Sequence, residues 1–178
     1  TNGDGLGTSD QYDGYNGAPD RYDWTVVGKA ENLSIQNNYQ VNLTPSADLL
    51  QPGHANPDPV RYEMRRQWVV EGNLKGSARH IYAKRVLRMD EDSGQITGGE
   101  MYDGRGELWR VQEVGQAPDY RPEATTCWTT GGEWIYDLLA GRYIALQLKS
   151  GRPANAVTGL ERLTPDYYTP ANVRRLGR

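Results

Sequence analysis

The strongest constraint on the fold is a repeated alternation of apolar and polar residues, interrupted by short turns. From residue 60 to 71 one set of alternating positions holds Tyr62, Met64, Arg66, Trp68 and Val70. Alternation with a period of two is the pattern of a β-strand, because successive side chains point to opposite faces of a sheet. Strands that follow one another through short turns predict an antiparallel meander. Comparable runs cover residues 21–30, 79–90, 95–102, 107–114, 133–138 and 142–149.

Several of these predicted strands are longer than the usual ~5–6 residues. Long strands in a small domain have to bend, and the pair Gly98-Gly99 is a suitable point for a bulge. The sequence therefore predicts a mainly β domain built on a strongly curved antiparallel meander, either a barrel or an unclosed barrel. One or two short helices are expected beside it, the first beginning at Thr44-Pro45 and the second at Thr169-Pro170.

The stretch MYDGRGELWRV, residues 101–111, predicts a hairpin that forms part of the wall of this sheet. Its tight turn is DGRG at 103–106, where the glycines tolerate positive φ. By strict alternation, Trp109 and Val111 share one face of the following strand, and Arg110 lies on the opposite face.

The composition favours half-buried sheet faces over a thick dry core. The chain has 178 residues, a mean hydropathy of -0.79, no phenylalanine, 12 tyrosines and 5 tryptophans. Tyrosine and tryptophan rings are apolar at one end and need a hydrogen-bond partner at the other. A net charge of -3 and a pI near 5.4 argue against a nucleic-acid-binding protein, which uses an excess of lysine and arginine. No run of 18 apolar residues occurs, so no transmembrane segment is predicted.

The first twenty residues are rich in glycine, aspartate and asparagine, and they predict a flexible lead-in or linker (1–20) before the domain at 21–178. Their spaced carboxylates raise the alternative of a calcium site. The spacing lacks the regular loop and the closing bidentate glutamate of such sites, so a solvated loop is the favoured interpretation. The acids concerned are Asp4, Asp10, Asp13 and Asp20.

No motif in the chain points to a reaction. Neither His54 nor His80 has a cysteine, a second histidine or a paired acid at metal-ligand spacing. Cys127 has no nearby basic residue to activate it, which favours an inert small side chain over a nucleophile. The acids at 90–92 lie in one predicted turn, where they cannot face each other across a cleft as a glycosidase pair does. We therefore expect no enzyme activity, no cofactor and no metal site.

Arginines are interleaved with acids on neighbouring predicted strands and allow two interpretations. The first is cross-strand pairing with glutamates on a solvated sheet face. The second places some arginines inward, Arg66 with Trp68 in particular, to hold an anionic head group or a carboxylate of a partner. Tryptophans and tyrosines likewise fit either core packing or the lining of an apolar groove. The arginines concerned are Arg61, Arg65, Arg66, Arg79, Arg85, Arg88, Arg105 and Arg110.

Six blocks of sequence, in this order, resemble the C-terminal half of a bacterial family of unknown function described as outer-membrane lipoprotein-sorting-like. Together they span nearly the whole chain after the first twenty residues, and none of them is a catalytic motif. The blocks are DRYDWTVVGKAE (20–31), NPDPVRYEMRRQWVVEGNLK (56–75), RHIYAKRVLRMDEDSGQI (79–96), YDGRGELWRV (102–111), YDLLAGRYIALQL (136–148) and LTPDYYTPANVRRLGR (163–178).

The resemblance implies a fold like that of the lipoprotein carrier LolA and the receptor LolB, an unclosed barrel around a hydrophobic cavity with helices as a lid. It also implies export by Gram-negative bacteria with a cleaved signal peptide, and hence a periplasmic location. Residues 21–178 would then be the C-terminal part of a single LolA/LolB-like β domain whose N-terminal half lies outside this chain. We expect them to depend on that half for solubility, because open sheet edges promote aggregation.

Residues and resemblance together predict a periplasmic, non-enzymatic binding or carrier protein for a lipid or another hydrophobic molecule, related to outer-membrane lipoprotein sorting or lipid transport. One alternative is a scaffold or adaptor that docks on an outer-membrane or transporter partner. Another is a carbohydrate-binding protein that uses aromatic platforms. Arg66 is the candidate contact for an anionic head group. The predicted hydrophobic ligand-binding face consists of Met64, Trp68, Val70, Trp109, Val111, Ile144 and Leu146.

Overall fold

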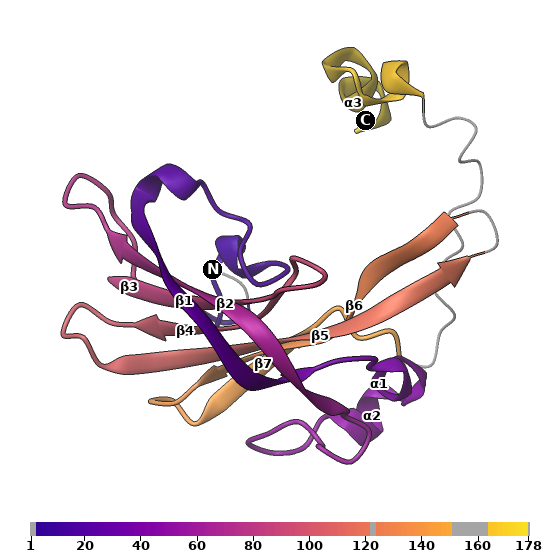
Figure 1. Ribbon diagram of the computed structural model, residues 1–178, viewed down its shortest axis with the longest axis horizontal. Helices are drawn as coiled ribbons and strands as arrows, with labels where there is room; N and C mark the ends of the chain where they lie inside the picture. Colours follow the sequence, from indigo (N-terminus) through magenta and orange to yellow (C-terminus); the bar gives the residue numbers. More distant parts are fainter. Residues whose placement is uncertain (1–2, 122–123, 151–163, 178) are drawn as a thin grey trace.

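Seven antiparallel strands, each hydrogen-bonded to the next along the chain, form one sheet in the computed structural model, which describes residues 3–121, 124–150 and 164–177 (Figure 1). The first and last strands do not pair with each other, so the sheet is open. The predicted mainly β fold, a curved and unclosed antiparallel meander, is thus confirmed. The strands are β1 (Tyr22–Ile35), β2 (Tyr62–Leu74), β3 (Lys84–Asp90), β4 (Ile96–Tyr102), β5 (Leu108–Arg121), β6 (Ala124–Asp137) and β7 (Arg142–Leu146).

Short helices and turns occur before β1, between β1 and β2, and near the C-terminus of the chain. The α-helices are α1 (Tyr39–Leu43), α2 (Ser46–Leu49) and α3 (Pro170–Leu176), and the 3-10 turns are η1 (Ser9–Gln11), η2 (Pro19–Arg21) and η4 (Pro165–Tyr168). The predicted helix after Thr44-Pro45 is α2, and the predicted cap of α3 is confirmed because the Thr169 side chain accepts a hydrogen bond from the backbone of Asn172. No described helix has the length and apolar character needed to cross a membrane.

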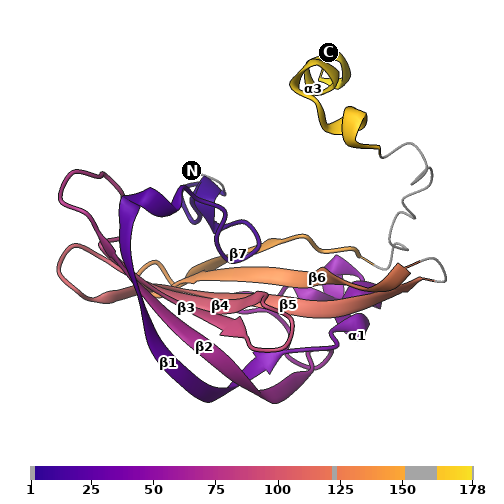
Figure 2. The same cartoon turned by 45° about the horizontal axis from the view of Figure 1, so that its top comes forward.

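Register shifts give the sheet its curvature. In the β1–β2 pair the register slips between Val26 and Gly28, and in the β3–β4 pair it slips where Arg88 faces Gly98, next to the predicted bulge at Gly98-Gly99. An extra residue on one strand bends that strand and increases its twist. The β1–β2 ribbon therefore coils across the sheet toward β5 (Figure 2), and the backbone N–H of Asn38 donates to the carbonyl of Gln116, 2.9 Å away.

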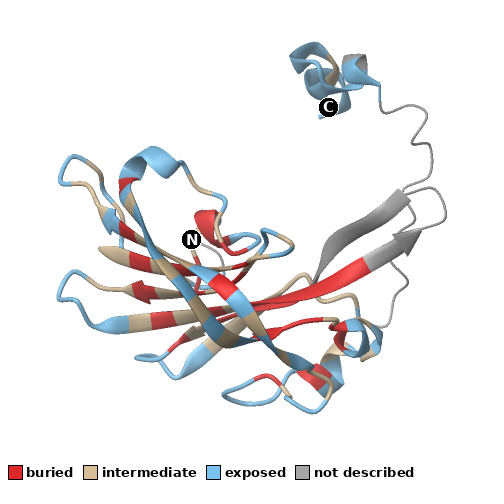
Figure 3. Ribbon diagram, in the orientation of Figure 1, coloured by how far each residue is buried: buried red, intermediate tan, exposed pale blue. Residues whose placement is uncertain are grey.

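The register also divides the central side chains between two faces. The N-terminal face, over which residues 3–17 lie, carries Gly72, Arg85, Met101 and Arg110 on successive strands. The opposite face, called here the cavity face, carries Val69, Arg88, Gly98, Glu113 and Trp134. Each face is covered by a different part of the chain, so both contain buried side chains (Figure 3).

Part of the cavity face is closed by an apolar cluster. Val41 of α1, Leu49 of α2 and Ala55 of the following loop pack against Ile35 and Trp134, and all five are buried. Burial of each large aliphatic side chain stabilises the fold by roughly 1.5–3 kcal/mol, so this cluster holds the two helices on the sheet. The helices in turn position the C-terminal end of β1, which borders the cavity described below.

Three local predictions need correction. Residues 79–83 are not part of a strand, because β3 begins only at Lys84. In the DGRG turn only Gly106 has a positive φ, of 83°. The register shifts between Met101 and Tyr102, and as a consequence Trp109 and Arg110 do not lie on opposite faces. Both donate hydrogen bonds to Oδ2 of Asp137, each at 3.0 Å.

Candidate functional site

A cavity of about 240 Å³ lies on the cavity face, where the C-terminal half of β1 passes in front of β4 and β5. Gly98 has no side chain to fill this space, and a Cβ built there would lie 3.1 Å from the carbonyl oxygen of Gln112. Leu33 is 63% exposed, so the cavity opens beside an apolar side chain. The lining residues are Asn32, Leu33, Ser34, Ile35, Gln67, Arg88, Thr97, Gly98, Gly99, Val111, Gln112 and Glu113.

Gln67 and Thr97 are two polar residues of the lining, and a chain of two hydrogen bonds links them to the backbone. The hydroxyl of Thr97 donates to the carbonyl of Arg88 at 3.3 Å, and Nε2 of Gln67 donates to the Thr97 hydroxyl oxygen at 2.9 Å. Gln67 is completely buried, and no described group donates to its Oε1. The amide oxygen of Gln67 is therefore a buried acceptor without a described donor.

Glu113 is the second acceptor on the cavity lining. Burial raises the pKa of its carboxyl above the ordinary value, and a hydrogen bond from the Tyr62 hydroxyl, at 3.1 Å, opposes the rise. The nearby guanidinium of Arg88 is paired with Glu100. Burial acts against ionisation of Glu100, but hydrogen bonds from Tyr102 and Arg88 hold its pKa below the ordinary value. The positive charge at the cavity is thus already balanced.

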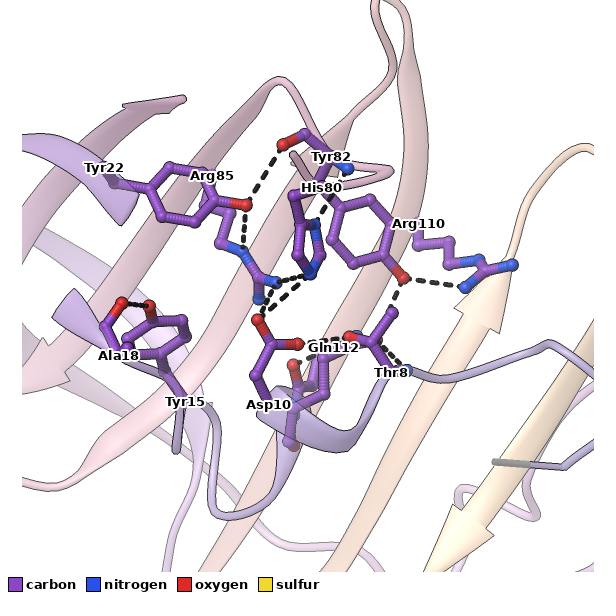
Figure 4. Close-up of polar contacts among 11 residues, drawn as sticks. Thr8, Asp10, Tyr15, Ala18, Tyr22, His80, Tyr82, Arg85, Arg110 and Gln112 are labelled. Atoms are coloured by element: carbon purple, nitrogen blue, oxygen red, sulfur yellow. Dashed lines mark hydrogen bonds and ion pairs between the residues drawn. The ribbon is translucent and has the colours of Figure 1, made fainter. Parts of the chain in front are cut away.

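A cluster of buried polar side chains, here called the anchor cluster, lies on the N-terminal face (Figure 4). Its centre is Asp10, whose Oδ2 is 2.7 Å from Nη2 of Arg85 and 3.1 Å from Nε2 of His80. The backbone N–H of Tyr82 donates to Nδ1 of His80, so the proton of a neutral ring is on Nε2 and points to Asp10. Nδ1 thus fixes the ring on its own loop, and Nε2 holds Asp10 of the N-terminal segment on the sheet.

The anchor cluster continues through Tyr82 toward β5. Nη1 of Arg110 donates to the Tyr82 hydroxyl at 2.7 Å, and that hydroxyl donates to Oε1 of Gln11 at 2.9 Å. Nε2 of Gln112 donates to the carbonyl of Gln11 at 2.6 Å. Because the donors and acceptors are mostly used within the cluster, it ties the N-terminal segment to β3 and β5.

These contacts correct two expectations. Asp10 is buried, so the solvated-loop interpretation is wrong for this residue. The acid paired with His80 lies 70 positions away in the chain, so the absence of a ligand at metal-ligand spacing in the sequence still holds. Arg85 and Arg110 are 0% and 3% exposed, so they do not belong to a solvated sheet face. Within the described part of the chain, no three His, Cys, Asp or Glu side chains gather as metal ligands.

The residues of the predicted hydrophobic face do not lie together in the structure. Val111 lines the cavity. Trp68 is 39% exposed and lies under Nζ of Lys29, 4.3 Å from the ring centroid, while Val70 pairs with Val26. Trp109 is hydrogen-bonded to Asp137 within reach of the anchor cluster. Ile144 and Leu146 pair with Ile135 and Glu133 of β6. That these residues bind a ligand stays a prediction.

Met64 and Arg66 lie outside the cavity, in a second depression of about 170 Å³. Arg66 is exposed and forms an ion pair with Glu91, so its charge is shared with a carboxylate already. Glu31 and Asp92 also border the depression and disfavour an anion there. The role of Arg66 as a head-group contact stays a prediction. Cys127 is in β6 opposite Asp119, but its side chain lies outside the described residues.

Sequence reasoning missed the polar residues of the cavity, Gln67, Thr97 and Glu113. Gln67 alternates with the predicted apolar residues Met64, Trp68 and Val70, whereas Glu113 shares the face of Val111. Polar side chains in a strand are by default expected to face solvent, which hides both residues from the sequence pattern. The signal that pointed to them was the pair Gly98-Gly99, which was interpreted as a bend but also leaves space in the sheet wall.

Comparisons with known proteins place the chain in one family. The family model for proteins of unknown function DUF1329 matches residues 1–174. The uncharacterized protein PA3922 of Pseudomonas aeruginosa is 42% identical over 179 residues, which cover 99% of this chain and 38% of the relative. The chain thus spans well under half the length of this relative.

Two crystal structures are more distant. A DUF1329 family protein from Desulfovibrio piger is 13% identical, with a TM-score of 0.46 over 71% of this chain and 38% of that protein. A domain from Vibrio parahaemolyticus, described provisionally as an outer membrane lipoprotein-sorting protein domain, is 11% identical, with a TM-score of 0.45 over 70% of this chain and 39% of that one.

Proposed function

Because the chain belongs to the DUF1329 family of proteins of unknown function, we propose that it is part of a periplasmic, non-enzymatic protein that binds or carries a lipid or another amphipathic molecule. The periplasmic location is part of the proposal and follows from the resemblance to envelope lipoprotein-sorting proteins.

The cavity on the cavity face is the observation that carries this proposal. Its lining combines apolar side chains, Leu33, Ile35 and Val111, with the polar groups of Gln67 and Glu113. An amphipathic molecule has the same two kinds of surface, and each buried methylene contributes about 0.8 kcal/mol to binding. Nucleophilic catalysis would require a nucleophile beside a base, whereas Glu113 is hydrogen-bonded to Tyr62 and Gln67 to Thr97.

The size of the cavity suggests which part of such a molecule would enter it. Sites for complete small molecules usually measure about 300–1,000 Å³, and this cavity measures about 240 Å³. It therefore suits a head group or one end of a chain. The rest of the ligand would extend past Leu33, the exposed residue at the opening.

Lipid uptake by the protein at its natural length tests this proposal. We expect native mass spectrometry to detect a co-purified lipid, and delipidated protein to bind a fluorescent fatty acid or phospholipid. Val111→Phe fills part of the cavity and should weaken binding at least tenfold. Val27→Phe, at a position 64% exposed on β1, is the matched control and should leave it unchanged. If neither assay detects a lipid with the wild-type protein, the carrier function is wrong.

A second candidate, a scaffold or adaptor that docks on an envelope protein, is favoured by the edge of β1. This strand has 14 residues and hydrogen-bonds to β2 on one side only within the described sheet. Val26 and Val27 are more than 60% exposed beside that edge. An unpaired edge with apolar side chains can accept a strand from a partner. A photo-reactive residue at position 27 should then capture an envelope protein in cells, and the absence of any captured neighbour counts against this function.

A further inference from the structure

We propose that the turn between β6 and β7, residues 138–141, docks the protein on the surface of a phospholipid bilayer by inserting Leu138 and Leu139 between the lipid head groups. The cavity is lined by residues between Asn32 and Glu113, so this turn is a separate surface of the molecule. The inference therefore goes beyond the proposed function, and neither depends on the other.

The residues of this turn, here called the leucine turn, differ from those of an ordinary hairpin turn. They are Leu-Leu-Ala-Gly, and Leu138 and Leu139 are 51% and 66% exposed. Hairpin turns favour glycine, asparagine and aspartate, as in DGRG at 103–106 and DEDSG at 90–94. Gly141, with a φ of 61°, supplies the left-handed backbone position, so the turn conformation does not require the two leucines. Their exposed apolar surface is therefore available for a contact outside the chain.

The backbone of the leucine turn can leave water because its donors are already used. The N–H of Leu138 donates to the carbonyl of Trp109 at 3.0 Å. The N–H groups of Leu139 and Ala140 donate to Oδ1 of Asp137, at 3.1 and 2.8 Å. A backbone N–H that loses its water without another partner is costly in a bilayer. Three consecutive N–H groups of the turn avoid that cost.

The charge of Asp137 does not oppose insertion, because the carboxylate lies behind the turn and is balanced. Asp137 is buried, and its Oδ2 is 3.0 Å from Nη2 of Arg110. Burial acts to raise the pKa of Asp137, but the N–H of Ala140 and the guanidinium of Arg110 hold that pKa below its ordinary value. The ion pair therefore persists, and it presents no net charge to the lipid.

Two further turns lie at the same end of the sheet. Successive turns of a meander alternate between the two ends, so the β2–β3, β4–β5 and β6–β7 connections lie together (Figure 1). Ile81 and Leu108, beside the first two, are exposed like the leucines. Each connection also has an exposed arginine within it or directly after it, namely Arg79, Arg105 and Arg142. Apolar tips flanked by arginines complement a bilayer, in which anionic phosphates lie just outside the apolar region.

Acids at this end of the sheet limit the attraction to phosphate. Arg142 lies 3.3 Å from Asp4, and Arg105 lies 2.9 Å from Asp103. Glu107 is exposed beside them. Exposed ion pairs of this kind are weak and are screened by salt. We therefore expect the leucines to supply most of the binding, and the arginines a smaller part that depends on salt.

The shape of the leucine turn favours a bilayer over a protein partner. A protein interface of standard size buries about 800 Å² on each side. Two leucines at the tip of a turn form a much smaller surface. A bilayer, in contrast, accepts single projecting apolar side chains at any point of its surface.

Vesicle binding by the protein at its natural length is the first test. We expect it to co-sediment with vesicles of phosphatidylcholine and phosphatidylglycerol, and the double substitution Leu138→Ser and Leu139→Ser should weaken this binding at least tenfold. Leu43→Ser is the matched control and should bind as the wild type does, because Leu43 is 64% exposed at the end of α1, at the opposite end of the sheet (Figure 1).

Two results of this test overturn the inference. One is a wild-type protein that does not bind the vesicles, and the other is equal binding by the leucine-turn variant and the Leu43→Ser control. Because all three leucines are exposed, the midpoint of urea unfolding should be the same in wild type and variants, so a loss of binding is not a loss of folding. Vesicle binding that disappears in about 0.5 M salt would mean that charge alone holds the protein, and it also overturns insertion of the leucines.

An environment-sensitive fluorescent amino acid at position 139 is the second test. Its emission should be that of a water-exposed probe in the free protein and should shift to the blue when vesicles are added, whereas the same probe at position 43 should not shift. An apolar signal at position 139 before vesicles are added means that another part of the full-length protein covers the turn, and the inference is then wrong. Vesicle binding by a protein that takes up no lipid supports docking and counts against the carrier function alone.

Discussion

Nη2 of Arg85 lies 2.7 Å from Oδ2 of Asp10, and this ion pair joins β3 to a residue 75 positions earlier in the chain. Arg85 is completely buried and Asp10 is 7% exposed. His80 and the hydroxyl of Thr8 also contact the carboxylate, so the pair is hydrogen-bonded as well as charged. The N-terminal segment is thus attached to the sheet by a contact whose loss would leave a charge in the interior.

Asp10→Asn should destabilise the protein strongly. Removing one partner of a buried ion pair leaves the other charge uncompensated, at a cost of about 3–5 kcal/mol. The measurement is the free energy of unfolding in urea. Asp23→Asn is the control, because the pair of Asp23 with Lys75 is exposed and spans 3.7 Å, and it should cost less than about 1 kcal/mol. An Asp10→Asn variant as stable as the control would contradict the anchoring role.

The same pair predicts how stability changes with acid. Burial of Asp10 acts to raise its pKa, but hydrogen bonds from His80 and Thr8 and the charge of Arg85 together hold the pKa well below the ordinary value. A lowered pKa in the folded state gives a contribution that is present above the ordinary value of about 3.9 and is lost as the pH falls below it. The stability difference between wild type and Asp10→Asn should therefore shrink between pH 5 and pH 2. A difference that stays constant over this range would show that the carboxylate charge is unimportant.

The contribution of Glu113 to stability should change with pH in the opposite direction. Its pKa is raised by burial, so its contribution to stability is present below the ordinary value of about 4.3 and is lost as the pH rises through the folded-state value. Glu113→Gln cannot ionise and should gain stability relative to wild type between pH 4 and pH 8. Tyr62→Phe removes a hydrogen bond that lowers the pKa, so it should steepen the loss. Thermal unfolding at several pH values measures both effects, and a Glu113→Gln difference independent of pH would refute the prediction.

Asn38 connects the helical segment to the sheet. Its backbone N–H donates to Gln116, and its side-chain amide donates to the carbonyl of Gly131. Asn38 is completely buried, so Asn38→Ala should leave unpaired groups and cost about 1–3 kcal/mol. Asn56→Ala is the control, because the side chain of Asn56 donates to the carbonyl of Asp48 in an exposed position.

Urea unfolding distinguishes the two asparagine variants. The Asn56→Ala variant should lose less than about 1 kcal/mol, the range of a solvent-exposed hydrogen bond. If the two variants lose equal stability, the Asn38 contacts do not hold α1 on the sheet.

The sequence by itself determined those features that depend on neighbouring residues. Alternation with a period of two identified the strands of the meander, the DGRG stretch identified one hairpin turn, and Thr169 identified the start of α3. These signals are local because the direction of a strand side chain, a turn conformation and a helix cap each involve only a few consecutive residues. The family resemblance likewise depended on short blocks in a fixed order.

Only the tertiary structure decided which side chains meet. Asp10 and Arg85 are brought together across 75 residues, and no periodic pattern relates them. A one-residue shift of the β4–β5 register brings Trp109 and Arg110 to the same carboxylate of Asp137, although alternation alone separates them. Gln67 is buried although it is a polar position of β2, because its face of the sheet is covered where the C-terminal half of β1 passes in front of β4 and β5. Local patterns report the alternation of a strand, but curvature and register decide what each face of the sheet contacts.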